Sequence, residues 1–306
     1  MKTCKPVLRV LAAVLAFACI AIAADAPKLE IKFATVKKKG AQSTHVYGVN
    51  NAGVMVGRYV NSAGTVSHGF KLEGQQWTTL DDPKGSTFNE CEAINSQGVI
   101  VGDYKDSSGI STSYIYNEHH NGKFRDIGPA NSATAGINDS GVVTGAYVDS
   151  HGHQYGYVWH RNTWTRLDKP GAVWTYAVGI NNKGLITVQW GDKAGNAESS
   201  LYNLNTKRYI ATINVPGALN TYAHGIDSAG DVVFNWDDST TGLPPHGALC
   251  TNCASNSRTY YKFDDPKGTA GTTGNGINDH RLIVGVYLTN GGAGFEGFKA
   301  TYHLEP

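Results

Sequence analysis

The sequence has no long hydrophobic run beyond its first 22 residues. No later stretch approaches the roughly 20 apolar residues that a membrane-spanning helix needs, so we expect no transmembrane segment there. An excess of charge of one sign is also absent, because 26 basic and 25 acidic residues leave a formal net charge of +1. Without a basic stripe, neither nucleic acid nor an anionic membrane is an expected partner.

Recognisable metal and catalytic motifs are scarce as well. The sequence has no HExxH motif, and the CTNC stretch from Cys250 to Cys253 has no second CxxC to complete a zinc site. We therefore expect no metal site and no cofactor. Cys250 and Cys253 form either a local disulfide or a pair of inert thiols, and Cys91 is expected to be buried on an inner strand as a small hydrophobe.

The start of the chain has the features of a secretory signal peptide. Basic residues up to Arg9 precede an apolar run over 10–22, and a small-residue site ends at Ala23. We expect residues 1–23 to be removed and the protein to be secreted or periplasmic. Lipid anchoring at Cys19 is the less favoured alternative. Removal of the signal takes away three basic and no acidic residues, so the formal charge changes from +1 to −2.

A twelve-residue motif, seen as GINDSGVVTGAY at 136–147, occurs six times in a chain rich in Gly and Tyr. Successive copies are 43 to 51 residues apart, a period that is typical of solenoids and propellers. The abundance of Gly and Tyr, with few helix-favouring stretches, favours an all-β chain with many turns. The copies begin at Gly48, Ala93, Gly136, Gly179, Gly225 and Gly276.

Each repeat unit contains four short strand-like segments separated by turn residues. In the third unit these segments are 133–138, 142–148, 155–160 and 163–168, with NDSG and DSHG as turns. This pattern predicts a four-stranded antiparallel blade, which must stack on its neighbours to bury both faces. We therefore predict an all-β fold: a six-bladed β-propeller of four-stranded antiparallel blades.

The two ends of the chain predict how the ring closes. The sixth copy ends after its third strand, at 297–302, while an unassigned strand covers 28–36 before the first copy. The N-terminal strand is expected to complete the last blade. Residues 24–306 then form a single propeller domain.

The recurring motif resembles the HAF family of probable extracellular repeats. The likeness is fullest in GVNNAGVMVGRY, HGFKL and WTTLDDPKG of the first unit, and it covers essentially the whole mature chain. It implies a bacterial exported repeat protein but no substrate or catalytic residue. The fourth and fifth units depart from it, with TVQW and VFNW in place of the VG.Y pattern.

Residues just before each copy are the candidates for a binding site. In propellers the first strand of each blade lines the central channel, and the loop that leads into it lies at the mouth. Aromatic, carboxylate and imidazole groups there suit a carbohydrate or another polar, ring-bearing ligand. Alternatively, the aromatics pack between blades and the polar groups face a wet channel. The candidate ligand-binding residues are His45, Tyr47, Phe88, Glu90, Glu92, Trp174, Tyr176, Tyr222, His224 and Asn275.

Other functions remain open at this stage. Glu90 and Glu92 with His45 or His224 could act as acid and base in a polysaccharide lyase or hydrolase, although no spacing fixes their separation. A metal site made from His45, His224 and Glu90 is weaker still, because its ligands come from separate blades. The protein could also be a scaffold that binds a protein partner through its blade edges. The sequence alone does not show which residues face the ligand.

Overall fold

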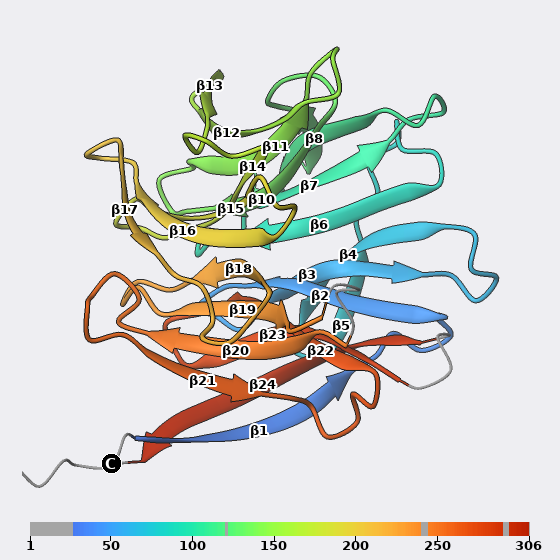
Figure 1. The fold of residues 1–306 in the computed structure, drawn as a ribbon. Helices are drawn as coiled ribbons and strands as arrows, with labels where there is room; N and C mark the ends of the chain where they lie inside the picture. Colours follow the sequence, from blue (N-terminus) through green and yellow to red (C-terminus); the bar gives the residue numbers. More distant parts are fainter. Residues whose placement is uncertain (1–26, 120–121, 240–243, 290–293, 306) are drawn as a thin grey trace, which may run out of the picture.

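The computed structural model describes residues 27–119, 122–239, 244–289 and 294–305, and every regular element in them is a β-strand (Figure 1). The signal peptide expected at 1–23, with Cys19, lies outside these residues. Across the described part of the chain, no helix has the length and hydrophobicity needed to cross a bilayer.

The strands follow one another along the chain with short connections. They are β1 (Lys28–Val36), β2 (Ser43–Val49), β3 (Met55–Val60), β4 (Ser67–Glu73), β5 (Gln76–Thr79), β6 (Phe88–Ile94), β7 (Ile100–Lys105), β8 (Ser111–Asn117), β9 (Lys123–Asp126), β10 (Ser132–Ile137), β11 (Val143–Val148), β12 (Gln154–His160), β13 (Thr163–Leu167), β14 (Trp174–Ile180), β15 (Leu185–Gly191), β16 (Ala197–Asn203), β17 (Arg208–Thr212), β18 (Asn220–Ile226), β19 (Val232–Asp237), β20 (His246–Thr251), β21 (Thr259–Phe263), β22 (Gly271–Ile277), β23 (Leu282–Leu288) and β24 (Phe295–Glu305).

The strands form four-stranded antiparallel sheets, as the repeat predicts. Sheets β10–β13, β14–β17 and β18–β21 each run in sequence order. Strands β2–β5 and β6–β9 make two more such sets, joined by a single parallel pairing between Ser67 and Phe88. In the third unit, each observed strand end lies within one residue of the predicted end.

Turn residues explain why the strands break where they do. In the NDSG turn, the Asn138 Oδ1 accepts hydrogen bonds from the backbone N–H groups of Ser140, at 3.1 Å, and Val142, at 3.0 Å. Gly141 follows with a φ of 74°, in the left-handed region that suits glycine. The side chain thus replaces backbone partners that a tight turn cannot supply.

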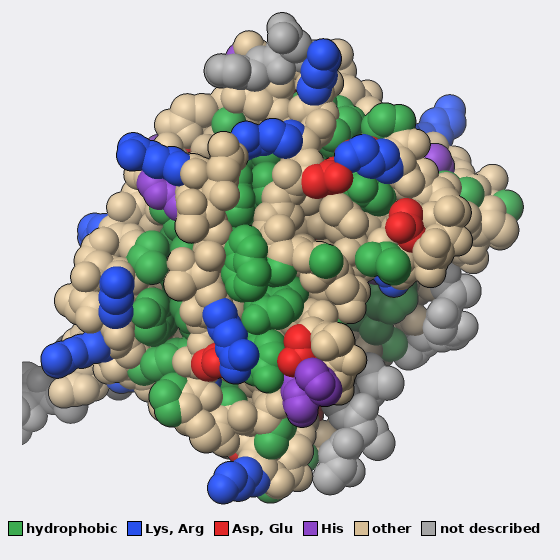
Figure 2. Space-filling view, turned by 90° about the horizontal axis from the view of Figure 1, so that it is seen from above, with side chains coloured by type: hydrophobic (Ala, Val, Ile, Leu, Met, Phe, Trp, Pro, Cys, Tyr) green, Lys and Arg blue, Asp and Glu red, His purple; other side chains and the backbone are tan. Residues whose placement is uncertain are grey.

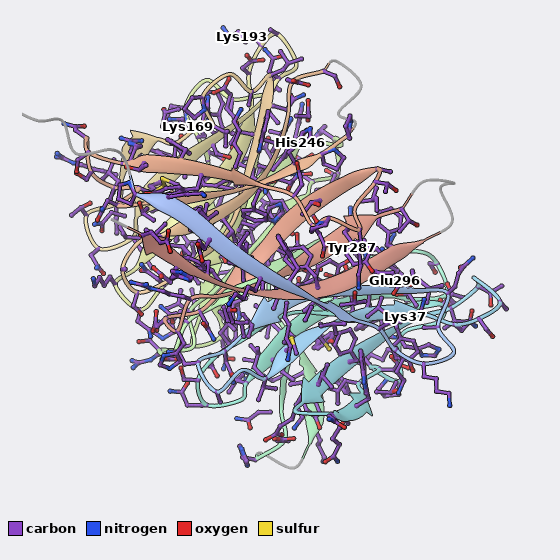
Figure 3. The ribbon with its side chains drawn as sticks, turned by 90° about the horizontal axis from the view of Figure 1, so that it is seen from below. Lys37, Lys169, Lys193, His246, Tyr287 and Glu296 are labelled. Atoms are coloured by element: carbon purple, nitrogen blue, oxygen red, sulfur yellow. A yellow bond between two sulfur atoms is a disulfide. The ribbon has the colours of Figure 1, made fainter. Side chains whose placement is uncertain are left out.

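Strand β1 pairs with β24, far along the chain, and so joins the sheet of β22 and β23. The antiparallel register runs from Lys28 opposite Glu305 to Val36 opposite Gly297. Just beyond β1, Lys37 forms an ion pair with Glu296, and Figure 3 shows both near Tyr287. The expected pairing of the N-terminal strand with the last repeat is therefore present.

The core is divided into six apolar clusters, each shared by two neighbouring sheets. One cluster joins the last sheet to the first, since Val284 of β23 packs with Val46 of β2 and Phe70 of β4. Strand β2 also contacts β22 and β24, as it contacts β6 on its other side. Each sheet therefore buries both faces against other sheets.

Charged side chains are dispersed on the face shown in Figure 2. Lysine and arginine side chains there are scattered among acidic and hydrophobic ones, without forming a continuous stripe.

Candidate functional site

A bulge at the same place in each first strand turns one side chain inward. The pairing of β2 with β3 shifts register between Val46 and Gly48, and the other five first strands shift at the equivalent position. A β-bulge re-aims side chains and disturbs the ladder locally. The residues at these bulges, Tyr47, Glu92, Ala135, Val178, His224 and Asn275, all line one cavity of about 240 Å³.

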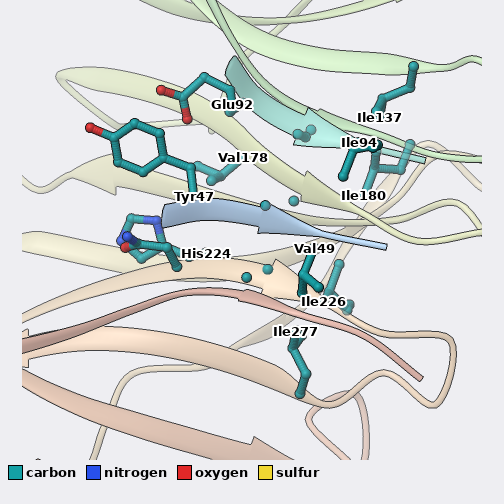
Figure 4. A pocket seen from close by; sticks show the side chains of 18 of the residues that line it. Tyr47, Val49, Glu92, Ile94, Ile137, Val178, Ile180, His224, Ile226 and Ile277 are labelled. Carbon is teal, nitrogen blue, oxygen red and sulfur yellow. The ribbon is translucent and has the colours of Figure 1, made fainter. Parts of the chain in front are cut away.

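Two further polar side chains complete this channel cavity. Tyr176 comes from β14 and Gln189 from β15. Figure 4 shows Tyr47, Glu92 and His224 together at one end of the cavity, with hydrophobic side chains at the other. The cavity therefore has a polar end, which we call the mouth, and an apolar end, which we call the floor. The floor residues are Val49, Ile94, Ile137, Ile180, Ile226 and Ile277.

Neighbouring first strands approach each other closely above this floor. A Cβ on Gly276 would lie 2.8 Å from the backbone oxygen of Tyr47, and a Cβ on Gly225 would lie 3.1 Å from that of Asn275. Only glycine fits such an approach without moving a backbone. Glycine therefore suits the first motif position where strands of adjacent repeats meet, and Ala93 is the one other residue found there.

Below the floor, asparagine side chains link one repeat to the next. The Asn50 Nδ2 donates a 3.1 Å hydrogen bond to the backbone oxygen of Asn95, and the Asn278 Nδ2 donates a 2.9 Å bond to that of Asn50. We call this set the asparagine belt. It consists of Asn50, Asn95, Asn138, Asn181 and Asn278, with Asp227 in the sixth position.

Asp227 is the exception in the belt. Its backbone oxygen accepts a 2.9 Å bond from Asn181, but its carboxylate has no N–H to donate onward. Burial raises the pKa of Asp227 from 3.8 to about 6, and repulsion from Asp231 and Asp279 adds to this effect.

Burial shifts the pKa values of the ionisable groups at the mouth. Burial raises the pKa of Glu92 well above its usual range, and the nearby charge of Glu90 raises it further. Burial also lowers the pKa of His224, so its imidazole is neutral at pH 7. The Tyr47 hydroxyl accepts a 2.9 Å hydrogen bond from the Arg58 Nε. Tyr47 and His224 thus present neutral polar groups to the cavity.

The structure separates the ten predicted site residues into groups. Five of them, Tyr47, Glu92, Tyr176, His224 and Asn275, line the channel cavity. Trp174 lines a second hollow of about 490 Å³, which shares Tyr176 and Gln189 with the cavity. We call this the outer hollow. Its other lining residues are Gly152, His153, Gln154 and Val173.

The remaining four predicted residues lie outside both spaces. His45 is buried with its ring 4.9 Å from that of Phe295, and burial lowers its pKa to about 3. Arg58 and Lys105 lie 5.3 and 5.0 Å from the ring centroid of Phe88. Glu90 is 3.5 Å from the Arg58 Nε, and Tyr222 lines neither space. The residue directly before each copy, not the one three before, therefore faces the cavity in most repeats.

Sequence reasoning missed Gln189 and Asp103, which lie ten residues after the starts of their copies. The available signal was variation at that position, which holds Gln189 in TVQW and Asn235 in VFNW. In these two repeats the departure from the motif puts a polar side chain on the second strand, β15 or β19. The Gln189 Nε2 donates a 3.0 Å hydrogen bond to the backbone oxygen of Ala223 in the next repeat.

Of the two predictions for the CTNC stretch, the structure confirms the local disulfide. Cys250 and Cys253 form a disulfide. Cys91 is a buried free thiol whose Sγ lies 3.3 Å from the Tyr114 hydroxyl. Both lie in the apolar clusters between sheets, away from the channel cavity.

Comparison with known proteins identifies a fold but no family. No protein-family model matches the chain, and no curated protein matches it. It is similar to a solved structure described as TolB from Agrobacterium tumefaciens, with a TM-score of 0.58 and 13% identity over 92% of this chain and 99% of that one.

Two further solved structures agree on the fold. The β-propeller domain of the Trilobed protease from Pyrococcus furiosus has a TM-score of 0.52 and 12% identity over 84% of this chain and 79% of that one. The SapL1 lectin, in complex with alpha methyl fucoside, has a TM-score of 0.54 and 10% identity over 86% of this chain and 95% of that one. The chain has a β-propeller fold.

Proposed function

We propose that this chain is an exported binding module, a closed six-bladed β-propeller that holds a carbohydrate or another polar, ring-bearing ligand at its channel mouth. The proposal includes removal of residues 1–23 as a signal peptide and membership of the HAF repeat family, on the motifs of the sequence. Export places the protein outside the cytoplasm, where surface glycans are available as ligands.

Contacts between the last and first repeats support the closed ring. Asn278 bonds to Asn50 in the belt, and the Asn275 Nδ2 donates a 2.9 Å hydrogen bond to the backbone oxygen of Val46. Strand β1 pairs with β24, so both ends of the chain belong to one sheet. The bond from Asn278 to Asn50 is the contact that also joins consecutive repeats elsewhere in the belt.

The observation that carries the binding proposal is the convergence of six bulges on one cavity. The bulges place different side chains at equivalent positions, including Tyr47, Glu92 and His224, above an apolar floor. Aromatic faces supply apolar area and the polar groups fix orientation, as in other small-ligand sites. The fucoside bound by SapL1 makes a sugar a reasonable first choice of ligand.

The outer hollow extends this site sideways. Trp174 lies there beside Val173, which is 55% exposed, and the hollow meets the cavity at Tyr176 and Gln189. A ligand longer than one ring can therefore occupy the cavity and rest on the indole. This favours an oligosaccharide over a small ion or metabolite.

Catalysis and protein scaffolding have less support. An acid and base pair would require Glu90 and Glu92 to reach the same ligand, but Glu92 alone of the two lines the cavity. The large exposed hydrophobics among the described residues are spread over several sheets, and singly scattered residues of this kind do not mark an interface. They are Ile110, Trp164, Val173, Ile210 and Phe295.

A glycan-array screen of the purified mature protein tests the proposal, with Trp174→Ala as the variant. We expect binding in the wild type and a loss of about fivefold or more in the variant, because an aromatic platform contributes about 1 kcal/mol or more. Trp164→Ala is the matched control, since Trp164 is 41% exposed on β13, outside the cavity and the outer hollow. Absence of binding by the wild type, or equal loss in both variants, would refute a glycan site at the mouth.

A further inference from the structure

Three carboxylates meet beside the channel cavity, and of these only Glu92 lines it. Carboxylate oxygens of Glu90, Glu92 and Asp103 all lie within 4.8 Å of one another. Glu90 and Asp103 are directly opposite in the pairing of β6 with β7, while the bulge at Glu92 turns that residue toward the cavity. Like charges this close repel each other strongly in a buried setting.

The surrounding positive charge does not balance the three carboxylates. The Arg58 Nε lies 3.5 Å from Glu90 and also donates to the Tyr47 hydroxyl. Lys105 lies 5.0 Å from the Phe88 ring centroid on the exposed end of β7, and its charge also acts on Glu90 and Asp103. Two cations thus face three carboxylates, and burial raises the pKa of both Glu92 and Asp103 well above the usual range.

A second observation points to something missing between β7 and β10. Asp103 Oδ1 and Thr134 Oγ1 are buried oxygens without a hydrogen-bond partner among the described residues. Asp103 is 3% exposed and Thr134 is fully buried, and β10 packs against both β6 and β7. Unpartnered buried oxygens are costly, so each is expected to have a partner in the working protein.

The fourth repeat contains the contact equivalent to the Asp103 position. Gln189 occupies the equivalent position there and donates to the backbone oxygen of Ala223, whose equivalent after Asp103 is Thr134. In the second repeat a carboxylate, which in its ionised form only accepts hydrogen bonds, stands where Gln189 donates. The Thr134 backbone oxygen already accepts a 3.4 Å bond from the Tyr176 hydroxyl. A cation between these oxygens would satisfy them together.

We propose that Glu90, Glu92, Asp103 and the Thr134 hydroxyl bind a calcium ion beside the channel cavity. The donors are all hard oxygens, and Ca²⁺ accepts six to eight such ligands in flexible geometry. A divalent ion among the three carboxylates would hold them in their ionised form. The side of Glu92 faces the cavity, so water or a ligand hydroxyl can fill the remaining positions. The ion site does not depend on the ligand being a carbohydrate.

Calorimetric titration of chelator-treated protein with CaCl₂ tests this proposal. We expect one ion per chain, and a loss of affinity of more than about tenfold in Asp103→Asn and in Glu92→Gln. Terbium used in place of calcium should give luminescence sensitised by Tyr47 and Tyr176, which line the same cavity. Circular dichroism of each variant shows that it is folded.

The control is Glu305→Gln in the exposed group of Glu30, His303 and Glu305, whose ligand atoms also lie within 4.8 Å of one another. This variant should bind calcium as the wild type does. No binding by the wild type, or binding lost in Glu305→Gln but kept in Asp103→Asn, overturns the proposal. The glycan array repeated with and without EDTA separates the two proposals, because a protein that binds glycan but no calcium refutes the ion site alone.

Discussion

Each residue of the Gly-Ile-Asn triplet has its own role in joining the repeats. Gly276 leaves room for the backbone of Tyr47, Ile277 contributes to the apolar floor, and Asn278 bonds to Asn50. The Asn278 Oδ1 also accepts from the backbone N–H groups of its own turn. One side chain thus fixes a turn and a contact between repeats, which explains why the triplet recurs.

Asp227 gives a prediction at this scale. Replacement by Asn supplies the missing donor toward the backbone of Asn278 and should raise the free energy of unfolding at pH 7 by about 1–3 kcal/mol. In the wild type the raised pKa means that the folded state holds the proton more tightly. Stability should therefore fall as pH rises from about 4 through about 6, and Asp227→Asn should lack this slope. Urea unfolding at several pH values measures both effects.

The reverse change provides the control. Asn181→Asp introduces a second acceptor where Asn181 now donates to Asp227, so this variant should be less stable at pH 7. If Asp227→Asn were no more stable than the wild type and kept its pH dependence, the belt would not be limited by this residue.

The sequence predicted which residue types vary near the channel, but it did not predict which of these side chains face the cavity. Aligning the copies identified Tyr47, Glu92 and His224 as varied positions near the channel. A regular strand puts residues 45 and 47 on the same face, so alternation could not choose between them. The bulge at Tyr47 turns this residue toward the cavity, and no residue type in the motif predicts a bulge there.

At the scale of elements, strand β1 lies far in the sequence from β22, β23 and β24, the other strands of its sheet. Phe33 packs with its ring 5.2 Å from Phe298 and 6.1 Å from Phe263, in two other strands. Its position was predictable because the last repeat lacks a fourth strand and the N-terminal segment matches one. The sixfold repetition made strand order easier to predict than any single side-chain contact.

Phe33→Ala should lower the free energy of unfolding by about 2 kcal/mol, since it removes a partly buried aromatic side chain from this contact. Lys32→Ala is the matched control, because Lys32 is exposed on the same strand and its loss should change stability little. Denaturant unfolding of both variants measures the difference. Equal stability of the two would show that β1 adds little to the last sheet.

The whole molecule combines a constant base with a varied mouth. The floor and the belt use nearly the same residues in every repeat, whereas the six bulge positions carry Tyr, Glu, Ala, Val, His and Asn. The last described sheet also packs against the first, through Val284, Val46 and Phe70. Stability is therefore shared by all repeats rather than concentrated in one.

We expect residues 24–306 to unfold in a single calorimetric transition, with the van't Hoff and calorimetric enthalpies in agreement. Loss of one sheet would expose the apolar faces of both neighbours, so partial unfolding is unfavourable. Differential scanning calorimetry measures this, and Asp227→Asn should move the whole transition to higher temperature. Two resolved transitions would mean that the sheets separate into independent groups.

The bulges have a consequence for protein engineering. The backbone bulge recurs in all six first strands, and the residue at each bulge lines the cavity. These residues are at positions 47, 92, 135, 178, 224 and 275. A library that varies Ala135 and Val178 would add new groups beside Glu92 and His224 while leaving the hydrogen bonds below untouched. The side chains that line the cavity could then be changed one position at a time, while the rest of the fold stays the same.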